Sequence, residues 1–286
     1  MNISNTWQDY ECLATGNKEK LERWGNIILN RPDPSIIWPK SNNKIWKNWD
    51  GYYHRANTGG GSWEYRKKIP ESWTINYKNL TFKVKPTSFK HTGIFPEQAT
   101  NWDYIMEKIS NSNIKDFRVL NLFAYTGCAT MAASSAGAKE VVHVDSSKGM
   151  IDWAKENMKL SHLENNTIRF IQEDVIKFLD REIRRGRTYH AIIMDPPSYG
   201  RGPNKEVWKY VDDIQELLNK SKQLLDKDYS FLLINSYTTG LSPISLNNIL
   251  SLIFDNSNIE TGEIGLPVTE NNLVLPCGIY GKVSKH

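Results

Sequence analysis

The chain has 286 residues, of which 39% are hydrophobic and 24% are charged, and its net charge is +4. This length predicts one large domain, or a main domain with a smaller module, and it allows a buried core. No apolar run reaches the roughly 18 residues that a membrane helix needs. The first ten residues contain no basic segment followed by an apolar one, so no signal peptide is expected. We therefore expect a cytoplasmic protein without membrane contact.

The cysteines give no sign of a structural framework. Cys12, Cys128 and Cys277 lie far apart, and no two of them have C-x-x-C spacing. Neither a disulfide framework nor a zinc site is expected from this pattern. The sequence therefore predicts no bound metal ion.

Basic and aromatic residues are concentrated at the beginning of the chain. Residues 1–90 contain 15 Lys and Arg against 8 Asp and Glu, whereas residues 91–286 contain 21 against 24. Seven of the ten tryptophans lie in the first 75 residues. This distribution favours an appended module that meets a polyanion. In the alternative interpretation, the tryptophans form the core of a small β module and the lysines coat it. The two interpretations are compatible for different residues.

Short strands separated by turn residues are expected at the beginning of the chain, at Gly25–Leu29, Trp73–Tyr77 and Leu80–Val84. We predict that residues 1–85 form a small β-rich module and that residues 86–286 form a second, larger domain. Within that domain strands and helices are expected to alternate. The expected strands are Phe117–Phe123, Glu140–Asp145, Thr167–Gln172, Tyr189–Met194 and Tyr229–Asn235. The expected helices are Gly127–Gly137, Lys148–Leu160, Val175–Arg185 and Lys205–Leu225. Two last strands, Asn258–Ile264 and Asn271–Tyr280, are expected to form an antiparallel hairpin. Repeated strand–helix units predict a parallel, doubly wound α/β sheet.

In such sheets, ligands bind at the carboxyl ends of the strands. The first core strand runs into a loop that contains Asn121, Phe123, Tyr125, Thr126 and Gly127. A glycine-containing loop ahead of a helix offers free backbone N–H groups to an anionic or polar ligand. A single glycine does not make a dinucleotide fingerprint. A ligand with a carboxylate and an amine, such as the methionine part of S-adenosylmethionine, needs fewer backbone N–H groups than a pyrophosphate does, so one glycine is sufficient.

Acidic residues follow the next two strands. Asp145 ends the second strand, where a carboxylate accepts hydrogen bonds from the ribose hydroxyls of an adenosine. Its alternative role is to cap the following helix, which begins with Ser146-Ser147-Lys148. Asp174, ahead of Val175, can accept a hydrogen bond from an adenine amino group. It fits equally well as a helix cap, and the two roles are not exclusive.

The fourth strand ends in Asp195-Pro196-Pro197-Ser198-Tyr199. Two prolines fix the backbone and remove two N–H donors. That leaves carbonyls and the Asp195 carboxylate as acceptors, which can hold a planar heterocycle by its N–H edge while Tyr199 stacks on it. We predict Asp195, Pro196 and Tyr199 as the catalytic residues.

Together these motifs resemble the class I S-adenosylmethionine-dependent methyltransferases. More narrowly, they resemble the bacterial 23S ribosomal RNA methyltransferases that act on cytosine C5 or guanine N7. The matching segments are Thr92–Gln98, Asn121–Gly127, Asp145-Ser146-Ser147 and Asp195–Tyr199. The resemblance covers about residues 85–280 and implies a Rossmann-like, seven-stranded methyltransferase sheet with S-adenosylmethionine as cofactor. The cofactor-binding residues that motifs and resemblance predict are Phe95, Gln98, Asn121, Phe123, Tyr125, Thr126, Gly127, Asp145, Ser146, Asp174, Val175 and Asp195.

The sequence departs from this family at two points. The family's N-terminal RNA-binding domain is not recognisable in residues 1–85. The C5 branch also carries a cysteine nucleophile in the loop after the fifth strand, whereas Asn235–Gly240 contains none. C5 methylation needs a thiolate that adds to the ring. Cys128 begins a helix, which lowers a thiol pKa, but a role as a small packing residue is favoured. We therefore predict methylation of a nitrogen, or else an oxygen, where a lone pair attacks the methyl group directly.

Three functions remain open from the sequence. We favour methylation of RNA, and of ribosomal RNA in particular, because of the basic first segment. The same chemistry also suits a small molecule or a protein side chain. A non-catalytic assembly factor that binds S-adenosylmethionine or RNA is the third possibility, and the intact Asp195–Tyr199 motif argues against it. The sequence makes no prediction about the oligomeric state.

Overall fold

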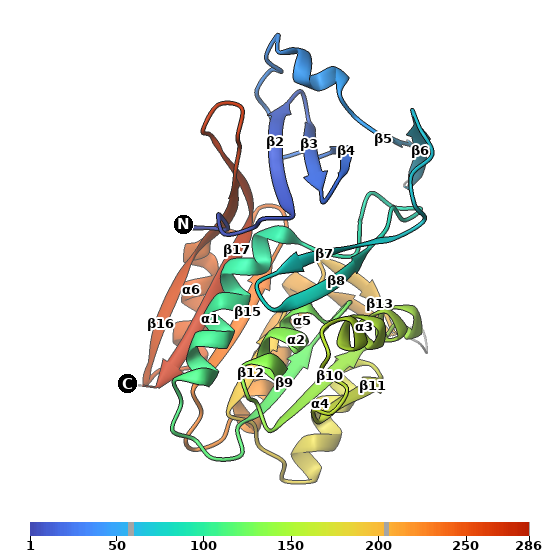
Figure 1. Ribbon diagram of the computed structural model, residues 1–286. Helices are drawn as coiled ribbons and strands as arrows, with labels where there is room; N and C mark the ends of the chain where they lie inside the picture. Colours follow the sequence, from blue (N-terminus) through green and yellow to red (C-terminus); the bar gives the residue numbers. More distant parts are fainter. Residues whose placement is uncertain (57–59, 203–205, 286) are drawn as a thin grey trace. The chain divides into compact units, whose positions relative to one another are not determined.

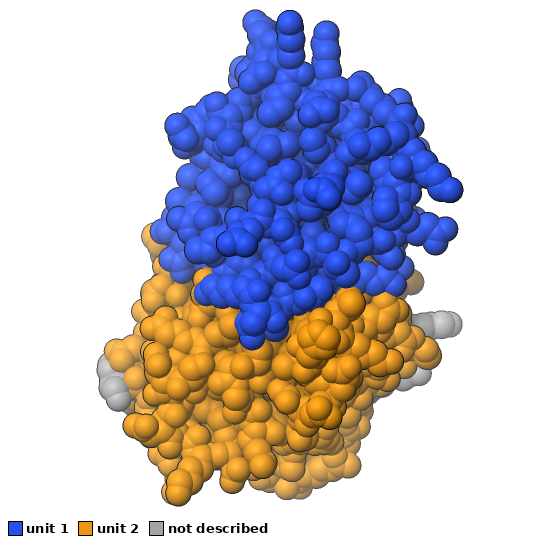
Figure 2. Space-filling model, in the orientation of Figure 1, with its two compact units in different colours: residues 1–100, 264–277 blue, residues 101–263, 278–286 orange. Residues whose placement is uncertain are grey.

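The computed structural model describes residues 1–56, 60–202 and 206–285, and the chain divides into two compact units (Figures 1 and 2). Unit 1 consists of Met1–Thr100 and Ile264–Cys277, and unit 2 consists of Asn101–Glu263 and Gly278–His286. The domain boundary placed between residues 85 and 86 stays a prediction. No helix in the described part of the chain is long and apolar enough to cross a membrane.

The largest sheet has eight strands in the order β1-β16-β17-β15-β12-β9-β10-β11. Its strands are β1 Asn2–Ile3, β9 Arg118–Leu122, β10 Glu140–Asp145, β11 Ile168–Gln172, β12 Ala191–Met194, β15 Phe231–Ser236, β16 Ser257–Pro267 and β17 Val274–Lys285. The five strands from β15 to β11 are parallel, and β17 runs antiparallel to β15. The predicted Rossmann-like α/β fold is thus confirmed. The two-residue β1 joins the seven expected strands at the edge of the sheet.

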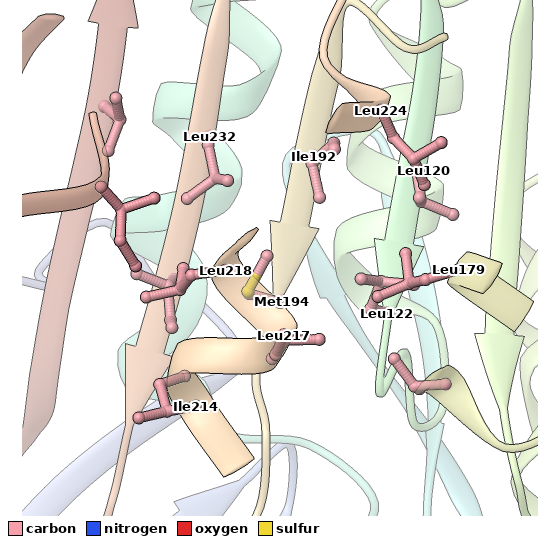
Figure 3. Close-up of a cluster of buried hydrophobic side chains, with 14 of the residues drawn as sticks. Leu120, Leu122, Leu179, Ile192, Met194, Ile214, Leu217, Leu218, Leu224 and Leu232 are labelled. Atoms are coloured by element: carbon pink, nitrogen blue, oxygen red, sulfur yellow. The ribbon is translucent and has the colours of Figure 1, made fainter. Parts of the chain in front are cut away.

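In the part of the chain that the structure describes, six α-helices accompany this sheet (Figure 1). They are α1 Ala99–Ser110, α2 Cys128–Ser135, α3 Lys148–Leu160, α4 Val175–Arg184, α5 Tyr210–Leu224 and α6 Pro243–Ile253. Successive strand side chains point to opposite faces of a sheet. Leu120, Ile192 and Leu232 therefore pack with α4, α5 and α6 on one face (Figure 3). Val119 and Ile193, one position away, pack with α1 and α2 on the other. The result is a sheet with a hydrophobic core on each side.

The direction in which strands are added reverses at β9. From β9 the chain proceeds outward to β10 and β11, and it then returns to place β12 on the other side of β9. Leu122 is paired in register with Met194 and with Val144. The residues that follow these strands, including Phe123 and Asp195, therefore leave the sheet at the same edge. Such a switch point is where doubly wound sheets bind ligands.

The helix predicted at Lys205–Leu225 begins later, at Tyr210. Lys205 itself lies outside the described residues. Ahead of the helix, β13 Tyr199–Arg201 and β14 Val207–Lys209 form an antiparallel hairpin. The reason is Trp208, which is buried and whose indole N–H donates to the Pro197 carbonyl at 2.6 Å. An extended backbone buries Trp208 while it leaves Val207 and Lys209 exposed. Helices α1 and α6 were not predicted.

Unit 1 is rich in β structure, as expected. One sheet has the strand order β2-β3-β4-β5-β6, and β7 pairs with β8. The strands are β2 Tyr10–Gly16, β3 Glu19–Trp24, β4 Ile27–Pro32, β5 Gly51–Arg55, β6 Gly61–Tyr65, β7 Trp73–Tyr77 and β8 Leu80–Val84. Two short 3₁₀ helices are η1 Lys44–Lys47 and η2 Pro96–Gln98. Trp24 is fully buried, which confirms the core interpretation for this tryptophan, and the other six in this segment are partly exposed.

A buried ion pair lies in the first sheet of unit 1. Glu22 on β3 is fully buried and accepts two hydrogen bonds from Arg31, at 2.6 and 2.8 Å. Tyr10 donates a third, at 2.7 Å. Burial alone raises the pKa of Glu22, but the charges of Arg31 and Lys20 lower it more, so the folded-state pKa lies below the usual value. The stabilisation from this pair is therefore present above the pKa of an unfolded glutamate and is lost as the pH falls.

Replacing Glu22 by Gln leaves the Arg31 guanidinium buried without its counter-charge. We expect Glu22→Gln to lower the free energy of unfolding by about 3–5 kcal/mol at neutral pH. The difference from the wild type should shrink as the pH falls below about 4.3, the pKa of an unfolded glutamate. Urea denaturation at neutral and acidic pH measures both effects. Glu11→Gln is the control, because the Glu11–Arg23 pair is about one-third exposed and should contribute at most about 1 kcal/mol.

Candidate active site

The loop after β9 has an unusual backbone. Phe123 and Tyr125 both have a φ of 52°, and Gly127 has a φ of 83°. Side-chain-bearing residues rarely adopt this left-handed region, and they keep it only where the surroundings hold them there. A Cβ added at Gly127 would lie 3.0 Å from the Cβ of Ala154 on α3. The loop is therefore constrained both by its own dihedral angles and by the helix beside it.

Asp145, the last residue of β10, holds this loop in place. Its Oδ2 accepts a hydrogen bond from the Tyr125 N–H at 2.9 Å, and its Oδ1 accepts one from the Ser147 N–H at 2.8 Å. Burial raises the pKa of Asp145 above its usual value, although both backbone hydrogen bonds act against the shift. Asp145 does not cap α3, because the cap is the side chain of Ser147, which accepts from the Met150 N–H. Each carboxylate oxygen retains a lone pair for a further donor.

The loop leads into the N-terminus of α2. The first N–H groups of any helix have no partner within the helix, and they carry its positive dipole end. Asn121 is buried, and its amide donates to Thr130 Oγ1 at 2.9 Å, which ties β9 to α2. Asn157 on α3 donates to the Thr126 carbonyl at 2.9 Å. These contacts fix where the N–H groups of α2 point, and the cofactor-binding roles of Asn121 and Thr126 stay predictions.

Cys128, the first residue of α2, is buried, and burial raises its pKa to about 12. A thiol of this kind carries no appreciable thiolate at neutral pH. This agrees with the interpretation of Cys128 as a packing residue.

The residues after β11 and β10 have defined structural roles. Asp174 caps α4, since its side chain accepts from the Lys177 N–H at 3.1 Å. The side chain of Val175 is buried in the core that α4 shares with the sheet. The Ser146 carbonyl accepts a weak hydrogen bond from Gln172 at 3.4 Å. The predicted contacts of all three residues with a cofactor stay predictions.

The motif that begins at Asp195 is held by hydrogen bonds to the segment Trp208–Tyr210 and to the loop after β15. The Pro197 carbonyl accepts from Trp208 and the Ser198 carbonyl accepts from the Tyr210 N–H at 3.1 Å. One lone pair of each carbonyl is therefore used by the hairpin, and the expectation that carbonyls of the motif accept hydrogen bonds from a ligand stays a prediction. Ser198 Oγ lies 2.9 Å from Thr238 Oγ1, in the loop after β15.

Within the motif, Pro196 is buried, whereas Tyr199 is 52% exposed. Burial raises the pKa of Tyr210 to about 12, and the charge of Asp195 contributes to the rise. Tyr210 and Trp208 were missed from the sequence. The hairpin interrupts the expected helix before Tyr210, and no local sequence motif indicates that interruption.

Phe95 and Gln98 belong to unit 1, whereas the other predicted residues belong to unit 2. Phe95 precedes η2 and its ring lies 5.5 Å from that of His91, and Gln98 is buried. Their predicted role in covering the cofactor stays a prediction.

Residues 52–240, more than half of the chain, match the model of a family described as S-adenosylmethionine-dependent methyltransferase. The chain belongs to this family of methyltransferases. It is also similar to a solved S-adenosylmethionine-dependent methyltransferase from Agrobacterium tumefaciens, with a TM-score of 0.94 and 31% identity over the whole chain and 93% of that structure. SMU.776, solved in complex with SAH, is 19% identical over 98% of this chain and 76% of that structure, with a TM-score of 0.75, and shows the fold alone.

Curated relatives match part of the chain. Ribosomal RNA large subunit methyltransferase K/L of Pseudoalteromonas translucida is 33% identical over 54% of this chain and 21% of the relative. Ribosomal RNA large subunit methyltransferase K of Neisseria meningitidis serogroup B is 28% identical over 68% of this chain and 51% of the relative. The chain thus spans between a fifth and a half of the length of these relatives.

The groups in the site suit the family's cofactor. S-adenosylmethionine offers a carboxylate, a ribose diol and an adenine amino group. The N–H groups at the start of α2 can donate hydrogen bonds to the carboxylate. The Asp145 carboxylate can accept from the ribose diol, and the Asp174 carboxylate can accept from the adenine amino group. Both carboxylates accept backbone hydrogen bonds from neighbouring residues, which orients them before any ligand binds.

Removing the Asp145 carboxylate should weaken cofactor binding in two ways, because a ribose acceptor is lost and the Tyr125 N–H loses its partner. We expect Asp145→Ala to weaken binding of S-adenosylmethionine by roughly 1–3 kcal/mol. Isothermal titration calorimetry measures the change. Asp152→Ala is the matched control, since Asp152 is an exposed carboxylate on α3 that pairs only with Lys148 among the described side chains. Unchanged affinity in Asp145→Ala would rule out the assignment.

Proposed function

We propose that this methyltransferase acts on RNA, at a base nitrogen of ribosomal RNA. The observation that carries the proposal is the Asp195–Tyr199 motif, which leaves β12 beside the cofactor loop and presents a carboxylate and an exposed aromatic ring. Carboxylates and aromatic rings are what proteins use to hold an unstacked base by its N–H edge and its face. The names of the curated relatives, which are ribosomal RNA methyltransferases, support the substrate class.

The hairpin that follows the motif also favours a polyanionic substrate. Strand register places Tyr199 opposite Lys209 and Arg201 opposite Val207, and all four are exposed on the same face. The opposite face, with Trp208, is packed against the protein. Arg201 donates to the Tyr199 hydroxyl at 3.2 Å, so a guanidinium lies next to the ring that we assign to the base. Cations in this place suit the phosphates that flank a target nucleotide.

The cysteines support nitrogen methylation. Carbon methylation at C5 of cytosine needs a thiolate nucleophile in the acceptor site. The loop Asn235–Gly240 has no cysteine, and burial raises the pKa values of Cys12, Cys128 and Cys277. A ring or exocyclic nitrogen needs no such nucleophile, since its own lone pair forms the new bond.

In this mechanism the protein acts mainly by alignment. Bound S-adenosylmethionine supplies an electrophilic methyl group. Asp195 accepts a hydrogen bond from the N–H edge of the base and turns the nitrogen lone pair toward the methyl group, and its carboxylate takes up the proton that a methylated amino nitrogen then releases. Pro196 fixes the direction in which that carboxylate leaves β12. Tyr199 stacks on the base and restricts its rotation, and Asp145 and Asp174 hold the adenosine.

This division of roles separates the effects of two substitutions. Asp195→Ala should lower kcat by about two orders of magnitude or more while cofactor binding stays nearly intact, because its contact strengthens in the transition state. Tyr199→Ala should mainly raise the KM for RNA, by the roughly 1–3 kcal/mol that base stacking contributes. Steady-state kinetics with RNA and calorimetry with S-adenosylmethionine distinguish the two. Loss of cofactor binding in a folded Asp195→Ala variant would place this carboxylate in the cofactor site.

The methylated atom can be identified directly. Mass spectrometry of nucleosides from RNA treated with the enzyme should show a methyl group on a base nitrogen. RNA containing 5-fluorocytidine should give no covalent adduct, and Cys128→Ser should keep its activity, because no thiolate takes part. A stable adduct that disappears in Cys128→Ser would contradict the nitrogen assignment. Methylation of protein or small molecules that is insensitive to salt, without any methylation of RNA, would favour those substrates instead.

A further inference from the structure

The edge strand β6 of unit 1 borders a cleft that the proposed mechanism does not use. The cleft has a volume of about 360 Å³, within the usual size of ligand pockets, and it is lined by Tyr65, by residues 67–71 and by Pro86. We call it the β6 cleft. All of its residues belong to unit 1, the part of the chain in which basic and aromatic residues are concentrated.

Tyr65 presents a rigid aromatic surface beside this cleft. Its side chain is 45% exposed, and its ring lies nearly parallel to that of Trp63, at 10° and a centroid distance of 6.2 Å. Trp63 is fixed in turn, since its indole N–H donates to the Thr87 carbonyl at 2.7 Å. Tyr53 packs on Trp63 from β5, edge to face at 5.3 Å. A ring held in this way binds a stacking partner at little cost in side-chain entropy.

Cations surround the same strand end. The Arg66 guanidinium lies 3.9 Å from the centre of the Trp49 ring, and Arg66 also donates to the Lys47 carbonyl. These contacts bring the segment Lys44–Trp49, which contains two lysines and no acidic residue, beside β6. Lys67 pairs with Asp50 at 2.7 Å. Lys67 and Lys68 line the cleft itself, against one lining carboxylate, that of Glu71, so the excess charge of the lining is positive.

We propose that the β6 cleft binds an unpaired nucleotide of the RNA substrate, with the base stacked on Tyr65 and a neighbouring phosphate on Lys68. This inference rests on the proposed function, since it takes RNA as the substrate. An exposed ring beside lysines is the combination that proteins use for single-stranded nucleic acid, because every base has a face for stacking and every nucleotide has a phosphate. An acidic peptide would satisfy the lysines but would leave the Tyr65 ring without a partner.

The stacking contact is tested with the full chain and a fluorescently labelled polyuridine oligonucleotide, by fluorescence anisotropy. Tyr65→Ala should raise the Kd about tenfold, which lies within the range for one stacked base. Tyr65→Phe keeps the aromatic face and should bind as the wild type does. Thermal unfolding of both variants checks that they are folded, and the half-exposed position of Tyr65 makes this the expected result.

The phosphate contact is tested through salt. For single strands, each lysine–phosphate contact contributes about 0.7 to the slope of log Kd against log salt concentration. Lys68→Ala should lower the slope by about that amount. Lys139→Ala is the control, because Lys139 is an exposed lysine of unit 2 and should leave the slope unchanged.

The outcomes separate this proposal from the proposed function. In methyl transfer to RNA, Tyr65→Ala and Lys68→Ala should raise KM and leave kcat at saturating RNA unchanged. A wild-type enzyme that neither binds nor methylates RNA would overturn the proposed function itself. A wild-type enzyme that methylates RNA, with unchanged KM and Kd in both variants, would overturn only the β6 cleft. Polyglutamate that binds as tightly as polyuridine, with no effect of Tyr65→Ala, would show that the patch attracts any polyanion and would also overturn it.

Discussion

The carboxylate of Asp145 is the contact on which the geometry of the active site depends. One oxygen holds the N–H of Tyr125 and the other holds the N–H of Ser147, so the loop after β9 and the turn into α3 are joined at one side chain. Phe123 and Tyr125 keep left-handed dihedral angles because this acceptor and the packing around them hold the backbone. The N-terminus of α2 is then presented in a fixed direction. A group expected to bind a ligand is thus also what shapes the pocket.

The topology of the sheet explains why two loops far apart in sequence form one site. The chain adds strands outward from β9, then returns to place β12 on the other side of it. The loops that follow these two strands therefore emerge side by side, one suited to the cofactor and the other to the acceptor. The hairpin β13–β14 then closes the acceptor loop, because Trp208 and Tyr210 occupy the carbonyls of Pro197 and Ser198. One lone pair of each of these two carbonyls is therefore used within the protein.

Much of unit 2 could be predicted because its strands and helices carry local signals. The ranges Glu140–Asp145 and Lys148–Leu160 match β10 and α3 as predicted. The predicted start of the helix that corresponds to α5 was wrong, because a buried contact of Trp208 with Pro197 overrides local helix propensity. No short sequence pattern encodes that contact. In unit 1 most strands were missed, and in β2 a bulge between Cys12 and Ala14 interrupts the alternation of buried and exposed residues by which a strand is recognised. Motif position predicted Asp145 as a site residue, but not the hydrogen bonds that orient its carboxylate.

Trp208 also connects the two halves of the reaction. Its ring packs on Phe123 in the cofactor loop, at a centroid distance of 5.1 Å, while its indole N–H is bonded to Pro197 in the acceptor motif. Buried side chains are packed too closely for one of these loops to move without displacing the indole. The positions of these two loops are therefore coupled through a single buried ring, so a displacement of one loop is passed on to the other.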